Sequence, residues 1–445
     1  MTGSIIHARA RLGACGIVAA FALALAATLM AFAAPAQAAE SVSTTVYASA
    51  QKANSFVFVP QKITVSSTEA ENFGYTDEVD SSKAVSQLDV LVKMHELKYG
   101  KAFTKDTATN YLALSGGFIT KALGETTYNW GIAQNNKAAV DETSDYTSYG
   151  YTGLAVTQAS VAKNDVVSLF YYDYIASDYS DATGISYFAN SKGSAVTTVS
   201  AVTGKKVALT ANELQNFMGN GSKNDADRAA ATITLAKAQL TAVNTSTGKQ
   251  KNISGAVTNS KGTASVSFKQ PGTYLVSAAP AAGTYTASPF VFVKVSIAKG
   301  YTAKVAGAKY TVTSTNKKTV TYVKAPTGKK TVKVPATVKL KDGKTYKVTK
   351  IAAKAFKSNK TVTKVVVGKN VTKIAKSAFY KTPKLHTVQV ASKHLKKAAT
   401  VKASFKGSKL KKALKVTTAK GVAKKYVKKS FTKKNLVAPK NVRVA

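Results

Sequence analysis

A repeat of 23 residues near the end of the chain restricts the fold more than any other feature of the sequence. Residues 348–370 align with residues 371–393 at nine identical positions, with an Ala-Phe pair that ends at Phe356 and again at Phe379. Apolar residues recur six, nine and eleven positions after each phenylalanine, at Val362, Val365 and Val367 and then at Leu385, Val388 and Val390. A unit this short cannot bury its own apolar side chains, so neighbouring copies must stack to form a common core.

Weaker copies of this unit follow. One centres on Phe405, with Leu414 and Val416 at the last two apolar positions, and a further trace ends near Phe431. Residues 301–445 are therefore predicted to form a short solenoid, with loose order expected after residue 417. The pattern Ile-x-x-x-Ala-Phe followed by a short strand resembles the BspA-type leucine-rich repeats of bacterial surface proteins. This resemblance implies a leucine-rich-repeat domain on a protein exposed at the cell surface.

The same residues carry almost all of the net charge. Residues 301–445 hold 39 Lys and one Arg against a single acid, Asp342, whereas residues 39–300 hold 22 basic and 20 acidic residues. A run of charge is usually a solvated face, and lysine commonly protects sheet edges. Ordinary surfaces mix both signs, however, so this imbalance predicts a polyanionic partner. The use of lysine rather than arginine favours attraction to delocalised charge over two-pronged recognition of one group.

Adjacent lysines suit a linear polyanion best. The expected partners are anionic cell-wall polymers or acidic host glycans, because an export signal at the start of the chain argues against nucleic acid. The candidate polyanion-binding residues are the five pairs Lys396 and Lys397, Lys411 and Lys412, Lys424 and Lys425, Lys428 and Lys429, and Lys433 and Lys434.

Residues 1–38 are typical of a secretory signal peptide. Arg9 and Arg11 precede an apolar stretch at 16–32, and residues 36–38 read Ala-Gln-Ala, a small-x-small cleavage site. An alternative is a lipoprotein box ending at Cys15, but the apolar stretch follows this cysteine instead of preceding it. Cys15 is the only cysteine, so the exported chain is expected to fold without disulfides, and no second apolar segment is long enough to span a bilayer. We therefore expect a secreted, extracellular protein associated with the cell surface.

Residues 39–54 are predicted to be a linker, and residues 55–175 an α+β domain. The pattern predicts a strand at 56–66 and a helix at 83–99, with Ser82 as its N-cap and Gly100 as its end. One apolar stripe of this helix indicates packing on a sheet. Further strands are expected at 112–114, 118–123, 128–133, 153–156 and 166–172.

This segment resembles the β-grasp family related to the C-terminal domain of transcobalamin. The resemblance rests on Gly-Gly-Phe-Ile at 116–119, Tyr-Asn-Trp-Gly-Ile at 128–132, and Lys-Asn-Asp-Val-Val-Ser-Leu-Phe-Tyr at 163–171. Asn135-Asn136 replaces the usual Asn-Gly, and Asn164-Asp165 replaces the usual Gly-Asp. Because some relatives contact a corrinoid, the resemblance implies a corrinoid as a candidate ligand, while no other cofactor is expected.

Residues 184–298 are predicted to form an all-β domain, because short Val/Thr/Ser-rich runs alternate there with Gly and Asn. The sequence of residues 259–274 resembles the hairpin of bacterial Ig-like surface modules, with Asn259 in the position of the usual acid. The resemblance implies an Ig-like β-sandwich that acts as a spacer.

No catalytic arrangement is evident. His95-Glu96 begins like a zinc-protease motif, but Tyr99 stands where the second histidine is required, and His95 is expected at the edge of a helix–sheet contact. The sequence has no nucleophile elbow, phosphate-binding loop or dinucleotide-binding turn. We therefore expect neither an enzyme nor a metal site.

Aromatic residues crowd the end of the first domain. Exposed tyrosine and tryptophan bind carbohydrate or protein ligands well, although the same residues also fill β cores, and Trp130 in particular fits a core position. The candidate ligand-binding residues are Tyr128, Trp130, Tyr146, Tyr149 and Tyr151.

Together these patterns predict a mainly β, multidomain, secreted adhesion or binding protein, held on anionic polymers by its polycationic repeat domain. The alternative is a ligand-capture protein, whose β-grasp domain binds a corrinoid or another small molecule.

Overall fold

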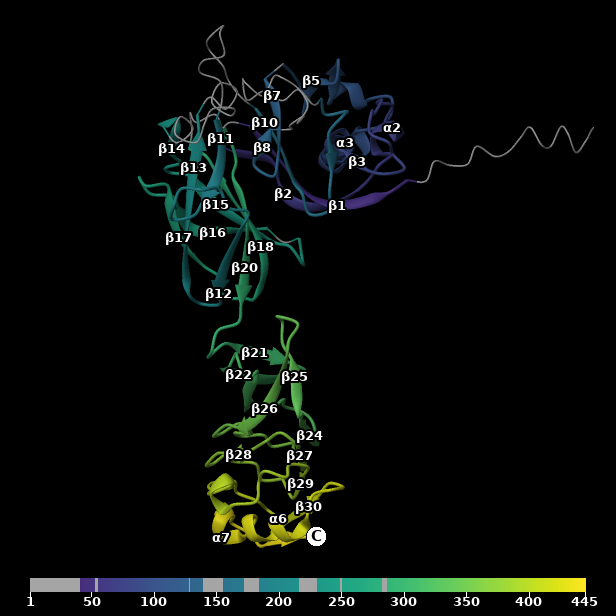
Figure 1. The fold of residues 1–445 in the computed structure, drawn as a ribbon. Coiled ribbons are helices and arrows are strands. Elements are labelled where there is room, and N and C mark those ends of the chain that lie inside the picture. The colour runs from purple at the N-terminus through teal and green to yellow at the C-terminus, as the bar shows by residue number, and fades with distance from the viewer. Residues whose placement is uncertain are drawn as a thin grey trace, which may run out of the picture. The chain divides into compact units, whose positions relative to one another are not determined.

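The structure, a computed structural model, describes residues 41–52, 55–127, 129–138, 155–171, 184–215, 230–248, 250–281 and 286–445 (Figure 1). The chain divides into two compact units. The first consists mainly of Lys62–Thr147 and Thr152–Leu169, and the second mainly of Phe170–Ala445. The second unit contains a β-sandwich and the repeat region, residues 301–445.

The first unit combines helices with a five-stranded sheet in the order β2-β1-β10-β7-β8. A three-stranded sheet, β4-β5-β6, and the pair β3-β9 complete it. This is the α+β arrangement predicted from the sequence. The elements are β1 (Ser43–Lys52), β2 (Ser55–Ser66), α2 (Glu69–Asn72), β3 (Val85–Ser86), α3 (Gln87–Tyr99), β4 (Ala113–Ser115), β5 (Phe118–Ala122), β6 (Glu125–Thr126), β7 (Trp130–Gln134), β8 (Lys137–Ala138), β9 (Ser160–Val161) and β10 (Val166–Tyr171).

The predicted linker at 39–54 is wrong, because most of it is strand β1. This strand lies between β2 and β10, so both of its edges are paired, and Val46, Tyr47 and Ala50 are buried. Its small residues made the segment look like a linker, yet Thr44, Thr45 and Val46 are β-branched and favour a strand.

Helix α3 begins four residues later than predicted, at Gln87 with Ser86 as its N-cap. The Ser86 hydroxyl accepts a hydrogen bond from the Asp89 amide at 2.9 Å, and the Asp89 carboxylate accepts one from the Ser86 amide at 2.9 Å. This capping box needs an acid three residues after the cap, which Ser82 lacks. The Ser82 hydroxyl instead donates to the Asp80 carboxylate at 2.6 Å. The predicted end of the helix at Gly100 is confirmed.

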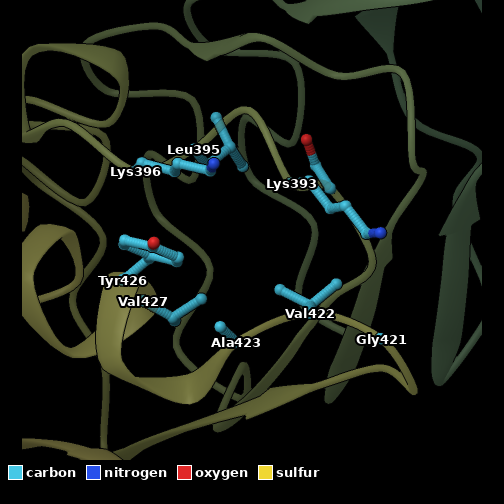
Figure 2. A pocket seen from close by; sticks show the side chains of 9 residues that line it. Lys393, Leu395, Lys396, Gly421, Val422, Ala423, Tyr426 and Val427 are labelled. Atoms are coloured by element: carbon cyan, nitrogen blue, oxygen red, sulfur yellow. The ribbon is translucent and has the colours of Figure 1, made fainter.

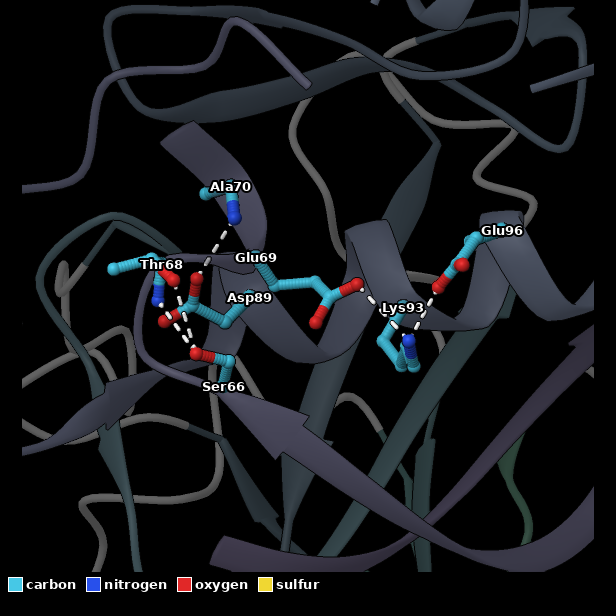
Figure 3. Close-up of polar contacts among 7 residues, drawn as sticks. All are labelled: Ser66, Thr68, Glu69, Ala70, Asp89, Lys93 and Glu96. Atoms are coloured by element: carbon cyan, nitrogen blue, oxygen red, sulfur yellow. Dashed lines mark hydrogen bonds and ion pairs between the residues drawn. The ribbon is translucent and has the colours of Figure 1, made fainter. Parts of the chain in front are cut away.

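The carboxylate of Asp89 also joins α3 to α2. It accepts a hydrogen bond from the Ala70 amide at 2.8 Å, as Figure 3 shows. Nearby, the Lys93 ammonium lies 3.1 Å from the Glu69 carboxylate and 2.5 Å from that of Glu96. Figure 3 draws both ion pairs along the same side of α3. The contacts from Asp89 to Ala70 and from Lys93 to Glu69 join the two helices, whereas the pair of Lys93 and Glu96 lies within α3.

The predicted strand at 153–156 is wrong where the structure describes it, because Val156 lies in a turn. This turn supports the first turn of α3: the Leu88 amide donates to the Val156 carbonyl at 3.0 Å. The Val156 carbonyl therefore accepts a hydrogen bond from the first turn of α3, where an amide has no acceptor within the helix, instead of pairing with a neighbouring strand.

The sandwich is formed by two sheets that share one core. Their orders are β14-β13-β11-β19, with β17 also paired to β13, and β12-β20-β18-β15-β16. Phe188, Leu209 and Val266 from the first sheet meet Leu240, Val276 and Val293 from the second in a single buried cluster. The strands are β11 (Gly184–Ala189), β12 (Thr198–Val202), β13 (Lys206–Leu214), β14 (Thr232–Thr234), β15 (Gln239–Asn244), β16 (Gln250–Val257), β17 (Thr263–Ser267), β18 (Gly272–Ala279), β19 (Thr286–Ala287) and β20 (Phe290–Ser296).

The turn before β17 shows what Asn259 does in place of an acid. Its side-chain oxygen accepts hydrogen bonds from the backbone amides of Lys261 and Thr263, at 2.9 and 3.0 Å. Gly262 has φ +67°, and a Cβ added there would lie 2.4 Å from the Ala211 carbonyl oxygen. Asn259 therefore closes the turn by itself, and glycine is required beside it because the backbone approaches so closely.

The repeat region is a solenoid with one continuous core that runs from Ile297 to Ala438. Its first sheet has the order β21-β22-β23-β26-β25, with β28 paired to β26, and its second has the order β24-β27-β29-β30-β31. The elements are β21 (Thr302–Val305), β22 (Ala308–Ser314), β23 (Thr319–Lys324), β24 (Thr331–Val334), β25 (Thr337–Lys339), β26 (Thr345–Ile351), β27 (Lys364–Val367), β28 (Lys373–Ile374), β29 (Thr387–Val390), β30 (Leu414–Thr418), α6 (Lys424–Ser430), α7 (Lys433–Leu436) and β31 (Val442–Val444).

The repeat positions pack as the sequence predicts. Val365 pairs with Val388, and Val388 with Val416, in a parallel ladder. The repeated aromatic rings stack along the core: the Phe356 and Phe379 centroids lie 5.1 Å apart, and those of Phe379 and Phe405 lie 4.5 Å apart. All of the apolar repeat positions are buried, so each copy covers the apolar face of its neighbour.

Loose order after residue 417 is not what the structure shows. Helices α6 and α7 and strand β31 complete the coil, with Phe431 and Leu436 buried and Leu414 paired with Val442. These last coils are longer than 23 residues because helical segments are inserted between the strands, which hides the period in the sequence.

Candidate polyanion-binding surface

The lysines of the repeat region cover the outside of the solenoid. Every one of the 39 is exposed except Lys364, which is half-buried. Strand residues alternate, so valines such as Val332 and Val334 point into the core while Lys333 between them faces water. The fold therefore holds the charges on a rigid frame.

These lysines lack acidic partners within the molecule. Among the described residues, no lysine of 301–445 forms an ion pair within 4.0 Å of an acid. The one acid of the region, Asp342, accepts hydrogen bonds from the Tyr346 hydroxyl at 2.8 Å and from the Lys344 amide at 3.1 Å. The positive charge is consequently available to an external anion.

The structure places the candidate lysine pairs in the last two coils. Lys396 and Lys397 follow β29, and Lys411 and Lys412 precede β30. All ten of these side chains are exposed, including the four on α6 at positions 424, 425, 428 and 429 and the two on α7 at positions 433 and 434.

Helix α6 is held by its apolar and hydroxyl side chains. Val427 and Ser430 are buried, and the Ser430 hydroxyl donates a hydrogen bond to the Leu395 carbonyl at 2.7 Å. Lys424 and Lys428, four residues apart, share the exposed part of the helix, as do Lys425 and Lys429. The helix is therefore a fixed platform for four positive charges.

Between the 392–396 loop and the start of α6 lies a pocket of about 100 Å³ (Figure 2). Tyr426 forms one side of it, and Leu395, Val422 and Val427 supply apolar surface. Ammonium groups gather at Tyr426: Lys396 Nζ lies 4.7 Å from the ring centroid and Lys425 Nζ lies 5.5 Å from it. Cation–π contacts at such exposed sites contribute about 0.5–1 kcal/mol each.

Sequence reasoning identified Lys396 and Lys425 but missed Tyr426, which completes this pocket. The available signal was an aromatic residue inside a run of lysines, at Lys-Lys-Tyr. The contact between Tyr426 and Lys396 could not be predicted, because it joins residues on two successive coils.

A second tyrosine has a similar environment. Lys381 Nζ and Lys354 Nζ lie 5.5 and 6.0 Å from the centroid of the Tyr380 ring. Gly407 lies against this ring, because a Cβ added there would come within 2.6 Å of it. Tyrosines thus anchor lysine side chains at two places on the solenoid.

Of the five aromatic candidates in the first unit, only Trp130 lies within the described residues. Tyr128, Tyr146, Tyr149 and Tyr151 lie outside the described residues. Trp130 is 5 % exposed on β7, and its Nε1 donates to the Glu125 carbonyl at 3.4 Å. A ring buried to this extent fits the core position, and its faces are not open to a ligand.

Several titratable groups elsewhere are shifted by burial. Burial raises the pKa of Glu213 to about 7. Burial also raises the pKa of Asp89 to about 6, against the lowering effect of the amides of Ser86 and Ala70. Among the described residues, no three His, Cys, Asp or Glu side chains are grouped so that they could hold a metal ion.

His95 is fixed in its neutral form. Its Nδ1 lies 2.7 Å from the Leu91 carbonyl oxygen, and its Nε2 accepts a hydrogen bond from the Leu123 amide at 2.9 Å. Nδ1 therefore carries the proton and donates a hydrogen bond to the Leu91 carbonyl oxygen. Burial lowers the pKa of His95 to about 4, because the charged ring loses its hydration there. A second proton at Nε2 would also break the hydrogen bond from Leu123.

Acidification should destabilise the first unit through His95. Since the pKa is about 4 in the folded state, below the ordinary 6.5, the neutral ring stabilises the fold fully above pH 6.5 and loses this contribution as the pH falls toward 4. The loss is about 3 kcal/mol by linkage. Urea unfolding followed by Trp130 fluorescence reports on this unit, because Trp130 is the only tryptophan.

At neutral pH the wild type should have a larger free energy of unfolding than His95→Leu, and this difference should narrow toward pH 4. The matched control His394→Leu, at an exposed histidine, should leave the wild-type profile unchanged. Parallel profiles for the wild type and His95→Leu would show that the ring does not titrate as its contacts require.

Comparison with known proteins gives solved structures only, because no protein-family model and no curated protein matches the chain. A leucine-rich repeat protein from Bacteroides capillosus is 19% identical, over 32% of this chain and 98% of that one, with a TM-score of 0.21. A leucine-rich cell surface protein from Faecalibacterium prausnitzii is 21% identical, over 27% of this chain and 38% of that one, with a TM-score of 0.21. The pneumococcal vaccine antigen PcpA is 16% identical, over 27% of this chain and 43% of that one, with a TM-score of 0.17. Within the described ranges, no helix is long and apolar enough to cross a membrane.

Proposed function

We propose that this protein is a secreted, non-enzymatic surface protein that its repeat region holds on anionic polymers. The observation that carries the proposal is the set of 39 lysines in residues 301–445, nearly all exposed, with one acid among them. Self-repulsion of this size destabilises a compact state unless a polyanion is nearby. The partners would be anionic cell-wall polymers or acidic host glycans.

The solenoid supports this role because its strands present charge at regular intervals. In the parallel ladder Lys364 pairs with Thr387, Thr387 with Lys415, and Lys415 with Arg443. Neighbouring strands lie about 4.8 Å apart, so this row is a short line of positive and hydroxyl groups. A linear polyanion could follow such a line without recognition of any particular unit.

The other parts have supporting roles in this proposal. The first unit, with one long helix and a five-stranded sheet, is compatible with a β-grasp domain that presents a binding surface. The sandwich is compatible with an Ig-like spacer, and the signal peptide at residues 1–38, outside the described residues, would direct export. Capture of a corrinoid by the first unit stays the alternative prediction.

Neutralising one lysine pair tests the anchor. A plot of log affinity against log salt has a negative slope. The double variant Lys428→Gln/Lys429→Gln should make this slope shallower by about 1.4 for a flexible polyanion, at about 0.7 per lysine. Affinity is measured by retention on beads that carry polyphosphate, and then on cell envelopes.

A matched control is Lys101→Gln/Lys105→Gln, which removes the same charge from exposed positions in the first unit. This control should leave the slope unchanged. Equal effects of the two double variants would mean that net charge alone, and not the repeat region, determines binding.

A further inference from the structure

The pocket beside Tyr426 differs from the rest of the lysine surface in having an apolar interior. Leu395 and Val427 are 1% and 2% exposed, and Val422 is half-buried, whereas Tyr426 is 37% exposed. Figure 2 shows the Tyr426 ring on one side of the opening and the Val422 side chain across from it. The pocket therefore offers a rigid apolar surface as well as charge.

Two lysines line this pocket and a third lies beside its tyrosine, and none of them has a counter-charge within the described part of the chain. Lys393 and Lys396 line it, and Lys425 Nζ lies 5.5 Å from the centroid of the Tyr426 ring. Among the described residues, none of these lysines forms an ion pair. The ammonium groups of Lys396 and Lys425, both beside the Tyr426 ring, repel each other, and a bound anion would reduce that repulsion.

We propose that this pocket is a subsite for one carboxylated sugar ring of an acidic glycan. The inference rests on the proposed function and names the ligand for one part of the surface. A pyranose ring has an apolar C–H face, which suits Leu395, Val422 and Val427 and, once the ammonium of Lys396 moves from the ring to the ligand's carboxylate, Tyr426 as well. Its carboxylate suits Lys393 and Lys396, because lysine is a compact point charge that needs no planar fork.

The apolar lining is what favours a carboxylated sugar over a polyol phosphate chain. A flexible phosphodiester chain has no flat apolar face, so it would gain only from the lysines. The pocket volume of about 100 Å³ admits part of one ring and not a folded oligomer. The rest of a glycan would therefore extend over the exposed lysines of α6 and α7.

Binding of the full chain to polymers of matched charge tests the subsite. The probes are a continuous polyuronate, a polymer in which glucuronate alternates with N-acetylglucosamine, and linear polyphosphate. Tyr426→Ala should weaken binding to at least one uronate polymer about tenfold and change binding to polyphosphate less than about twofold. If Tyr426→Ala weakens binding to the continuous polyuronate, the natural ligand is a glycan of the cell envelope. If it weakens binding to the alternating polymer, the natural ligand is a host glycan.

Two further variants control for folding and charge. Ala423→Leu places a side chain into the pocket, keeps every lysine, and should reproduce the selective loss. Lys411→Gln/Lys412→Gln removes two charges outside the pocket and should weaken uronate and polyphosphate binding by equal factors.

The outcomes separate this inference from the proposed function. If the wild type binds all three polymers but Tyr426→Ala and Ala423→Leu alter them equally or not at all, the subsite is refuted while the electrostatic anchor stands. If the wild type binds none of the polymers at low salt, the proposed function itself is refuted.

Discussion

Raising the salt concentration from about 50 to about 200 mM should weaken binding of the full chain to a flexible linear polyanion about 300-fold. The figure follows from counterion release, with a slope of about −0.7 per neutralised charge and about six lysines engaged. Six is a small share of the 39 lysines, because a linear chain follows only one path over the solenoid. The slope is measured with fluorescent polyphosphate in a titration at four salt concentrations.

A neutral glucan of the same length is the control and should not bind at any of these salt concentrations. Retention on the polyanion that does not change with salt would contradict the electrostatic anchor. The lysines would then be a solvated face that keeps the protein soluble, which is their ordinary role.

The sequence predicted the solenoid well because one physical requirement repeats along it. Each copy must bury the same apolar positions against its neighbours, so Val365 and Val388 occupy equivalent places in the ladder, as their spacing after Phe356 and Phe379 indicates. The prediction failed at the last coils. There, stability comes from Phe431 and other residues that pack through inserted helices, and inserted segments break the period from which the coil could be recognised.

Two elements of the first unit differ from the prediction for different reasons. The pattern of start and stop residues predicts Ser82 as the N-cap, but the acid at Asp89 selects Ser86. The sequence of β1 predicts a linker, because only the position of this strand between β2 and β10 explains why Val46 is buried. The capping box of Ser86 and Asp89 spans only four residues and could be read from the sequence, whereas the strands that flank β1 lie outside the window that a sequence pattern covers.

The candidate site could be predicted only in part. Charge is a property of composition, so the lysine surface could be recognised from the sequence. The pocket required contacts between Lys396 on one coil and Tyr426 on the next, and these depend on the length of the segments between them.

Removing one ring from the aromatic stack should have the largest effect on stability. Phe379 is fully buried, and its ring lies between those of Phe356 and Phe405, at 5.1 and 4.5 Å. Phe379→Ala should lower the free energy of unfolding of the repeat region by about 4 kcal/mol. Hydrogen exchange of the amides in β27 and β29 should then accelerate by up to about 1000-fold, since exchange from a cooperative unit follows its unfolding equilibrium.

The same substitution at Phe118, which is 48 % exposed on β5, is the matched control and should cost less than about 1 kcal/mol. Similar exchange rates in the two variants would show that the stack does not hold the coils together.

Because Phe379→Ala removes no charge, it also distinguishes the contribution of the packed coils to polymer binding from that of the lysine charges. Attraction through counterion release depends mainly on charge, so polyphosphate binding should survive in this variant. Selective binding of a uronate polymer should weaken, because the pocket at Tyr426 needs two adjacent coils in place.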